Sequence, residues 1–350
     1  MLLYIHIPFC DSKCYYCSFN SYVDKFHLKK AYMHSLYEQL QFELQRFAVK
    51  EKEIESLFIG GGTPSCVEAA LYKEIFELLT PYLKENIEIT TEANPNSATP
   101  QWLEQMYELG VNRVSFGVQS FNDAKLKLLN RAHNSHQAKE AIQNAYKVGF
   151  KNISLDLIYA VATDTKEILE NDLKTAFSLP INHLSAYALT IEEGTPFEKK
   201  PHLSHEKLSL TKWLFKQIES FGCKQYEISN FGKYRSFHNM GYWQYKDYIG
   251  AGSGAVGKMG SNRYYPTTNL EAYIANPLDI HTEMLSKEDQ KIEKIFLGLR
   301  SCVGVKDSIL NENELKKANI LIDEKKLIIK NDTFYNTDYL LADEIALFIS

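Results

Sequence analysis

The sequence predicts an α/β fold, a partial (β/α)6 barrel followed by a small, mainly helical C-terminal domain. In the first half of the chain, short runs of β-branched and aromatic residues alternate with amphipathic helical patterns. This alternation is typical of parallel strands joined by right-handed crossovers. Six such units end near Thr190, whereas an eight-unit barrel needs about 250 residues. The count favours a partial barrel and leaves an open doubly wound sheet as the alternative.

The candidate elements follow one another in a regular order. One helical pattern places Leu28, Tyr32, Leu36, Leu40 and Leu44 on a single apolar stripe. Another helix is expected to begin at Thr99-Pro100, a capping residue followed by proline at the first helical position. The six candidate strands are Leu3–Phe9, Glu55–Ile59, Ile87–Glu92, Arg113–Val118, Asn152–Tyr159 and His183–Leu189.

The second half of the chain has a different pattern. A loop rich in Gly, Pro and Glu (192–201) leads to a helix expected near 204–221, and a glycine- and aromatic-rich stretch (226–265) follows. The last part predicts helices and a short hairpin near 321–334. We therefore expect a barrel over residues 1–190, an extension over 191–284 and a small domain over 285–350.

Composition excludes several classes of protein. The chain has 350 residues, of which 45% are hydrophobic and 24% charged, with a net charge of −5. Clustered Lys and Arg, which nucleic-acid binding needs, are missing. No apolar run approaches the roughly 18–20 residues that span a bilayer, and no basic residue precedes the first apolar stretch. We expect a cytoplasmic protein with neither a nucleic-acid partner nor a transmembrane segment.

Three cysteines lie together after the first candidate strand. Cys10, Cys14 and Cys17 form C-x3-C-x2-C, and cysteine clusters in intracellular chains are more often metal-binding or catalytic than disulfide-bonded. A structural zinc needs a fourth ligand, for which His6 or Asp11 is available. A four-iron cubane on three thiolates instead leaves one iron open. The spacing favours the cluster and keeps zinc as the alternative.

Polar and glycine residues gather at the ends of the candidate strands. The turn Gly60–Pro64 follows the second strand and lets backbone groups approach a ligand, although it lacks the Lys-Ser/Thr of a P-loop. Glu92 ends the third strand, Gln119 closes the fourth, Asp156 lies within the fifth and Ala188 is near the end of the sixth. Carboxyl ends of parallel barrel strands share one face. We therefore expect a site for a polar small molecule beside the cysteines.

These motifs resemble those of radical S-adenosylmethionine (SAM) proteins. The segment Tyr4–Cys10, the cysteine loop and the Gly60–Pro64 turn carry the resemblance. The segments Gly117–Phe121, Asn130-Arg131 and Asp156–Tyr159 narrow it to the branch that contains oxygen-independent coproporphyrinogen III dehydrogenase. The resemblance covers nearly the whole chain. It implies a partial barrel whose [4Fe–4S] cluster, on the three cysteines, chelates the amino and carboxylate groups of SAM through its open iron.

The same resemblance implies which side chains surround SAM. Acidic residues can hold the ammonium group or the ribose hydroxyls, and Arg131 can grip a carboxylate through two parallel N–H groups. The metal ligands implied are Cys10, Cys14 and Cys17, and the SAM-binding residues implied are Tyr4, Tyr16, Gly61, Gly62, Thr63, Glu92, Gln119, Arg131, Asp156 and Ala188.

Two departures point to a particular subfamily. The dehydrogenase has a fourth cysteine where this chain has Phe19, and an N-terminal extension where only Met1 and Leu2 precede the first strand. By contrast, the segment His238–Trp243 reads H-N-x-x-Y-W and resembles a motif of the heme-chaperone subfamily. That subfamily binds heme and hands it to hemoproteins, expected to be respiratory. The dehydrogenase activity, oxidative decarboxylation of coproporphyrinogen III, is the alternative.

The heme interpretation also has a chemical basis. Histidine is a common proximal ligand of heme iron, and the rings of Tyr242 and Trp243 offer flat surfaces to a porphyrin. We expect His238 to bind heme, and the alternative is an aromatic loop packed between domains. Whether SAM is cleaved stays open, and cleavage would need a donor such as flavodoxin or ferredoxin. The run Gly250–Gly257 is expected to line the ligand cleft.

Overall fold

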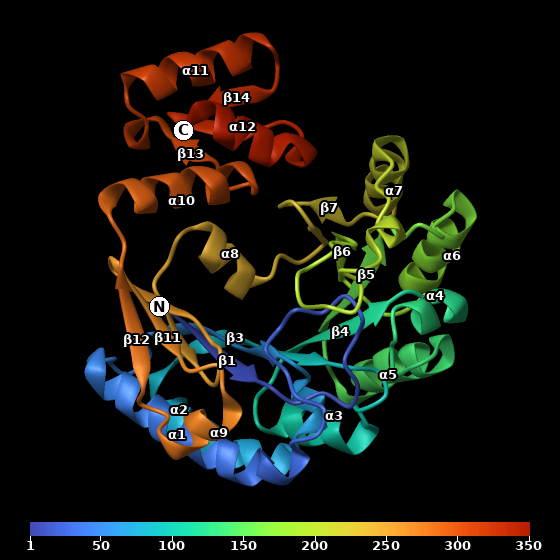
Figure 1. The fold of residues 1–350 in the computed structure, drawn as a ribbon, viewed down its shortest axis with the longest axis vertical. Helices are drawn as coiled ribbons and strands as arrows, with labels where there is room; N and C mark the ends of the chain where they lie inside the picture. Colours follow the sequence, from blue (N-terminus) through green and yellow to red (C-terminus); the bar gives the residue numbers. More distant parts are fainter.

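The computed structural model describes residues 1–350, and its centre is a twelve-stranded sheet. Six neighbouring strands run parallel in chain order and curve into the incomplete barrel that the sequence predicts (Figure 1). Each pairs with the next along the chain, as in a series of crossover units. They are β1 (Leu2–Ile7), β2 (Ile54–Gly61), β3 (Leu83–Ala93), β4 (Arg113–Gln119), β5 (Asn152–Tyr159) and β6 (His183–Ala188).

Strands from the second half of the chain extend the barrel at both edges. β9 (Tyr248–Ala251) pairs in parallel with β1, and β8 (Asn230–Gly232) pairs antiparallel with β6. Both edges of the six-stranded unit are therefore paired. The sheet continues through β10 (Gly257–Met259), β11 (Asn262–Pro266) and β12 (Ile280–Met284) on one side and β7 (Lys224–Gln225) on the other.

Helices cover the outer face of the barrel sheet. Because successive side chains of a strand point to opposite faces, Leu3, Ile5 and Ile7 of β1 enter a core of 56 buried residues, while the residues between them face inward. The helices are α1 (Lys29–Arg46), α2 (Lys73–Leu79), α3 (Pro100–Glu108), α4 (Asp123–Leu128), α5 (Ser135–Val148), α6 (Lys166–Phe177) and α7 (Leu208–Ser220). None of the helices combines the length and apolar character needed to cross a membrane.

The apolar stripe of α1 and the cap of α3 are found where the sequence predicts them. Tyr32, Leu36, Leu40 and Leu44 of α1 are buried, and Leu28 directly precedes the helix. The hydroxyl of Thr99 accepts the N–H of Trp102 at 3.1 Å, which satisfies one of the unpaired donors at the start of α3. The helix expected from residue 204 begins four residues later, after a short 3-10 turn at Pro201–Leu203.

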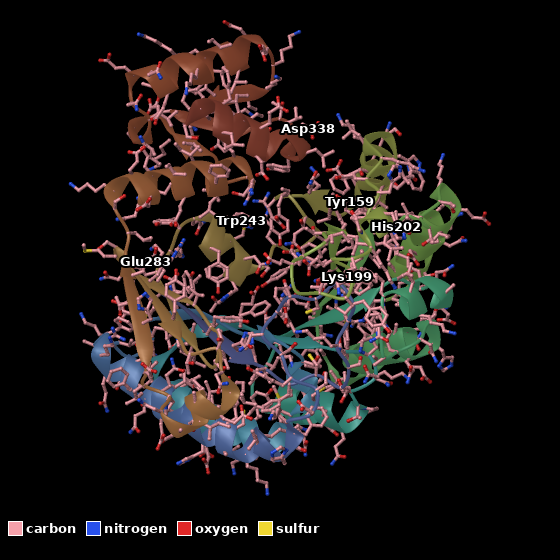
Figure 2. All side chains as sticks on the ribbon, viewed as in Figure 1. Tyr159, Lys199, His202, Trp243, Glu283 and Asp338 are labelled. Atoms are coloured by element: carbon pink, nitrogen blue, oxygen red, sulfur yellow. The ribbon has the colours of Figure 1, made fainter.

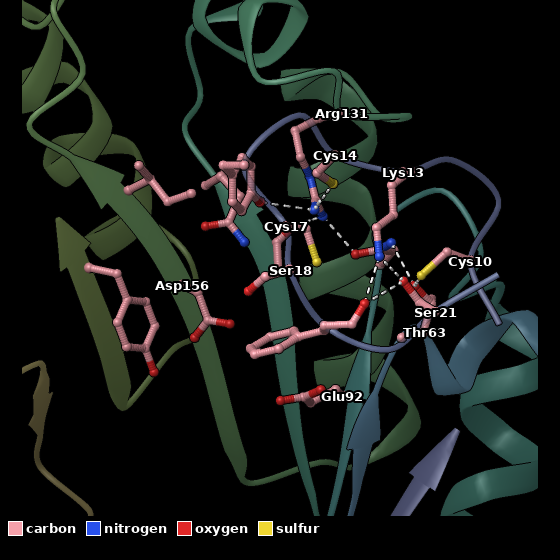
Figure 3. Close-up of a pocket in the computed structure, with 18 of the residues that line it drawn as sticks. Cys10, Lys13, Cys14, Cys17, Ser18, Ser21, Thr63, Glu92, Arg131 and Asp156 are labelled. Carbon is pink, nitrogen blue, oxygen red and sulfur yellow. Dashed lines mark hydrogen bonds between the residues drawn. The ribbon is translucent and has the colours of Figure 1, made fainter. Parts of the chain in front are cut away.

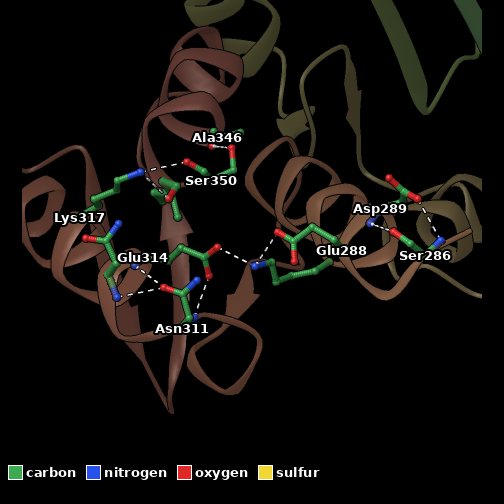
Figure 4. Close-up of polar contacts among 11 residues, drawn as sticks. Ser286, Glu288, Asp289, Asn311, Glu314, Lys317, Ala346 and Ser350 are labelled. Atoms are coloured by element: carbon green, nitrogen blue, oxygen red, sulfur yellow. Dashed lines mark hydrogen bonds and ion pairs between the residues drawn. The ribbon is translucent and has the colours of Figure 1, made fainter.

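The end of the chain forms a second hydrophobic cluster of 11 buried residues. Capping pairs Ser286–Asp289 and Asn311–Glu314 begin two of its helices (Figure 4). The expected hairpin is found slightly later, because Leu321 still belongs to a helix. The elements are α10 (Lys287–Leu299), β13 (Val305–Lys306), α11 (Glu312–Asp323), β14 (Leu327–Lys330), β15 (Thr333–Asn336) and α12 (Ala342–Ile349).

Two short helices complete the fold. α9 (Leu270–Ala275) packs against α1 on the outer face of the sheet. α8 (Phe237–Trp243) lies on the opposite, inner side, where it contacts both β2 and α10 (Figures 1 and 2). The segment with the H-N-x-x-Y-W motif therefore closes one part of the barrel interior.

Candidate functional site

A cavity of about 490 Å³ opens at the carboxyl ends of the barrel strands (Figure 3). It brings together segments that are far apart in the sequence, as the alternation of strands and helices requires. Of the residues predicted for the cluster and for SAM, only Tyr4 stays outside. The cavity is lined by Cys10, Cys14, Tyr16, Cys17, Gly61, Gly62, Thr63, Glu92, Gln119, Arg131, Asp156 and Ala188.

The glycine turn after β2 allows the backbone to pass close to its neighbours. Gly61 has φ of +109°, and a Cβ atom there would lie 2.5 Å from the ring of His6. At Gly62 a Cβ atom would lie 2.8 Å from the carbonyl oxygen of Ile7. Only glycine fits both places. The turn also orients a side chain, because the N–H of Gly61 donates to Glu92 Oε2 at 3.1 Å.

Hydrogen bonds within the cysteine loop and from neighbouring segments fix its shape. Lys13 Nζ donates to the carbonyl oxygen of Phe19 at 2.6 Å and to Ser21 Oγ at 2.7 Å. Asn130 Nδ2 donates to the carbonyl oxygen of Lys13 at 2.8 Å. Cys10 Sγ lies 3.3 Å from Thr63 Oγ1, on the glycine turn. The loop is thus held against α4 and β2, with its thiols on the cavity side.

The three thiols suit a cluster better than a single ion. Tetrahedral zinc would need a fourth ligand beside the three thiols. Both suggested fourth ligands are engaged. His6 is hydrogen-bonded through both ring nitrogens, and Asp11 accepts from Asn96 at 2.7 Å. In a cubane each thiolate binds its own iron, so the thiols need no common point.

Arg131 is tied into the protein and does not present a free pair of donors. Its Nη2 atom donates to Asn94 Oδ1 at 2.6 Å and to the carbonyl oxygen of Gly117 at 2.5 Å. Its Nη1 atom donates to Cys14 Sγ at 3.0 Å and to Tyr16 Oη at 3.3 Å. The sequence predicts that two parallel N–H groups of Arg131 bind a ligand carboxylate. This contact requires Arg131 to exchange some of these hydrogen bonds for bonds to the ligand. Asn94, just beyond the end of β3, was not predicted, because one asparagine after a strand carries no distinctive signal.

Two carboxyl groups form the acidic floor of the cavity. Burial and the nearby Asp156 carboxylate raise the pKa of Glu92 to about 7. Burial raises the pKa of Asp156 to about 6, although hydrogen bonding to Ser185 and the charge of Arg113 oppose the shift. Near neutral pH each group exchanges its proton readily. A cation bound between them would favour the ionised forms, so the floor suits an ammonium or sulfonium group.

Comparison with known proteins identifies the family. Residues 4–176 match the Radical SAM superfamily. The chain is 33% identical over 319 residues to "Heme chaperone HemW" of Bacillus subtilis, covering 86% of this chain and 84% of that protein. It is 40% identical over 271 residues to "Heme chaperone HemW" of Haemophilus influenzae, covering 73% and 70%. The chain belongs to the HemW family of radical SAM proteins.

A solved structure supports the fold of this HemW-family chain independently. Coproporphyrinogen III oxidase (HemN) from Escherichia coli superposes with a TM-score of 0.83 and covers 99% of this chain and 89% of its own, at 19% identity. The partial barrel is thereby confirmed, and the family match and the relatives confirm the resemblance inferred from the motifs. Membership of the radical SAM superfamily implies a [4Fe–4S] cluster and SAM.

One residue and one segment that were predicted to line the cavity of this HemW-family chain lie elsewhere. The hydroxyl of Tyr4 shares a hydrogen bond with His6 Nδ1 at 3.0 Å, and its ring packs near Phe58, below the cavity. The prediction that the run Gly250–Gly257 lines the ligand cleft is wrong. The run instead packs against the protein, where Gly252 N–H donates to Gln39 Oε1 at 2.8 Å. Its glycines serve close packing between β9, β10 and α1.

His238 of this HemW-family chain is buried far from the cysteines, with 1% of its surface exposed. Its Nδ1 atom lies 2.8 Å from Ser56 Oγ and its Nε2 atom 3.0 Å from Tyr242 Oη. Burial, with a smaller effect of the Arg113 charge, lowers the pKa of His238 to about 3, so the ring is neutral. Ser56 precedes Gly61 by five residues of β2, which is about 16 Å along a strand. The two parts of the predicted site thus lie at opposite ends of the barrel interior.

The acidic floor predicts a pH-dependent stability. Glu92 binds its proton more tightly in the folded than in the unfolded chain. Its contribution to the free energy of unfolding is therefore complete below about pH 4.5 and is lost as the pH rises through about 7. Glu92→Gln should therefore be nearly neutral at pH 5 and stabilising by as much as about 3 kcal/mol at pH 8. Urea unfolding at both pH values measures this. Glu85→Gln, on an exposed part of β3, is the control, and equal effects of Glu92→Gln at both pH values would contradict the account.

Proposed function

We propose that this protein is a heme chaperone, which binds heme and passes it to recipient hemoproteins from a radical SAM scaffold. The observation that carries the proposal is its identity of 33% to a heme chaperone over most of both chains. The H-N-x-x-Y-W segment at 238–243 supports it, as does Phe19 at the position of a fourth cysteine. Respiratory hemoproteins are the recipients that we propose.

In this proposal Cys10, Cys14 and Cys17 hold the [4Fe–4S] cluster. When bound, the cluster supplies electrons and one open iron for SAM. The protein's own contribution is to position and shield it. Arg131, with an N–H directed at Cys14 Sγ at 3.0 Å, places a positive charge beside the thiolates. Such a charge stabilises an anionic cluster. Flavodoxin or ferredoxin is the class of electron donor that we propose.

SAM would occupy the same cavity, beside the cysteine loop. Its positive charges suit Glu92 and Asp156, whose raised pKa values let them ionise as a cation arrives. The backbone of Gly61 and Gly62 passes directly along the cavity wall and can hydrogen-bond the ligand without a side chain between them. Tyr16, Thr63, Gln119 and Ala188 complete the wall, while Tyr4 supports it from below.

Heme would be bound through His238 on α8. A neutral imidazole is the form that ligates iron, and its low pKa keeps His238 in that form. Trp243, at the end of the same helix, has a buried indole N–H without an acceptor. A buried donor of this kind can serve a polar group of a ligand. Only 1% of the His238 surface is exposed in this conformation, so ligation requires α8 to move.

A product assay separates this proposal from the enzyme alternative. The anaerobically reconstituted protein is given coproporphyrinogen III, SAM and a reductant, and the porphyrins are analysed by mass. We expect no conversion, because Phe19 replaces the fourth cysteine of the dehydrogenase motif. Loss of two carboxyl groups over several turnovers would show that the protein is a decarboxylating enzyme and would overturn the proposal.

The cluster assignment predicts the effect of removing one ligand. Cys14→Ala should lose most bound iron and acid-labile sulfide, together with the brown absorbance, because two thiolates cannot hold the cubane firmly. Cys302→Ala is the matched control, since Cys302 lies outside the cavity. Iron and sulfide contents are measured after anaerobic reconstitution. Unchanged contents in Cys14→Ala would show that the cluster is bound elsewhere.

The heme assignment predicts a separable effect. His238→Ala should weaken heme binding at least tenfold and shift the Soret band, while iron and sulfide contents stay at the wild-type level. His183→Ala is a stringent control, because His183 is also buried in the barrel interior and hydrogen-bonded through both nitrogens, to Ser154 and Tyr226. If both variants reduce heme binding equally, the loss reflects general damage to the interior and His238 is not the ligand.

A further inference from the structure

The Glu88 carboxylate holds the first turn of α8 against β3. Glu88 is 7% exposed and belongs to the inward face of the strand. Its oxygens accept the backbone N–H groups of Phe237 at 2.8 Å and of His238 at 3.0 Å. They also accept the hydroxyl groups of Ser236 at 3.3 Å and of Tyr234. One acidic side chain thus receives four donors from the segment that enters α8.

This arrangement is favourable for a helix start. The first N–H groups of a helix have no partner within it, and a carboxylate near them also interacts with the positive end of the helix dipole. Hydrogen bonds to a charged acceptor are stronger than bonds between neutral groups. Glu88 is separated from α8 by more than 140 residues of sequence, so the contact also fixes where the helix lies on the sheet.

Further contacts complete the closed position. His238 lies between Ser56 Oγ and Tyr242 Oη and packs on Phe58, with 5.1 Å between ring centroids. Gly241 lies so close to β1 that a Cβ atom there would be 2.5 Å from Leu2 Cδ1. The helix α8 is therefore held against β1, β2 and β3 together. With 1% of its surface exposed, the His238 ring cannot be reached by heme iron while α8 stays in place.

We propose that α8 is a latch that must leave the barrel strands before His238 ligates heme, and that Glu88 is the positioning residue that holds the latch closed. The proposal rests on the heme-binding function proposed above. A protein whose binding-competent form is a small fraction of the population binds its ligand more weakly by that fraction. The closed latch therefore lowers the apparent heme affinity, and any event that releases Glu88 raises it.

The test is Glu88→Gln in the full-length, cluster-loaded protein. Glutamine keeps the shape but replaces one acceptor oxygen with an N–H donor and removes the negative charge, so the backbone N–H of Phe237 or of His238 loses its acceptor. We expect the apparent Kd for hemin to fall at least tenfold and hemin uptake to become faster. Soret titration and stopped-flow absorbance measure these. Glu85→Gln is the matched control, since it makes the same change on the same strand at an exposed side chain paired with Lys52.

A second readout needs no heme. Hydrogen exchange of the amides of residues 237–243 should be faster in Glu88→Gln than in wild type, and unchanged in Glu85→Gln. Ser56→Ala, which frees Nδ1 of His238 from the other side, should change exchange and affinity in the same direction. It therefore replaces Glu88→Gln if that variant does not fold. Unchanged exchange in both variants would show that these contacts do not hold α8 and would overturn the proposal.

The outcomes also separate this proposal from the heme function itself. Faster exchange without tighter hemin binding would show that the latch does not limit ligation, which overturns the proposal. The double variant Glu88→Gln with His238→Ala should lose the gain in affinity, and a gain that persists would mean that another group ligates the iron. If wild-type protein binds no hemin at all, the proposed function fails instead, while the exchange data still report whether Glu88 holds α8.

Discussion

The arrangement of the molecule depends on the inward-facing row of β3, where two acidic side chains project to the same side of the sheet. Glu88 accepts hydrogen bonds from the start of α8. Glu92, four residues further along, forms part of the floor of the cavity. Burying a carboxylate is costly unless it is hydrogen-bonded. Each acid meets this condition differently, Glu88 with backbone donors of α8 and Glu92 with the N–H of Gly61. One strand therefore positions both ends of the barrel interior.

Much of the fold and of the cavity could be predicted because it depends on local patterns. Short runs of β-branched and aromatic residues located β1 to β6, and a stripe at every fourth residue located the buried face of α1. The cysteine loop and the glycine turn have distinctive spacing that predicts a shared site, and the cavity brings their residues together.

The remaining features depend on contacts between distant segments. The hydroxyl of Tyr4 is hydrogen-bonded to His6 outside the cavity. The Nη2 atom of Arg131 donates to Asn94 and to the carbonyl oxygen of Gly117. The burial of His238 follows from Ser56, on a strand 182 residues earlier in the chain. No motif reports such pairings, because each requires knowledge of where α8 and the loops pack. The glycine run 250–257 was misassigned for the same reason, since close packing and ligand binding need the same residue type.

In the proposed function the cluster and heme sites lie at opposite ends of one barrel. Pulsed electron paramagnetic resonance on protein with a reduced cluster and ferric heme measures the separation of the two centres directly. We expect a separation of about 16 Å or more, because Gly61 follows Ser56 by five positions along β2. A separation under about 10 Å, three residues of strand, would contradict it and place the heme within the cluster cavity.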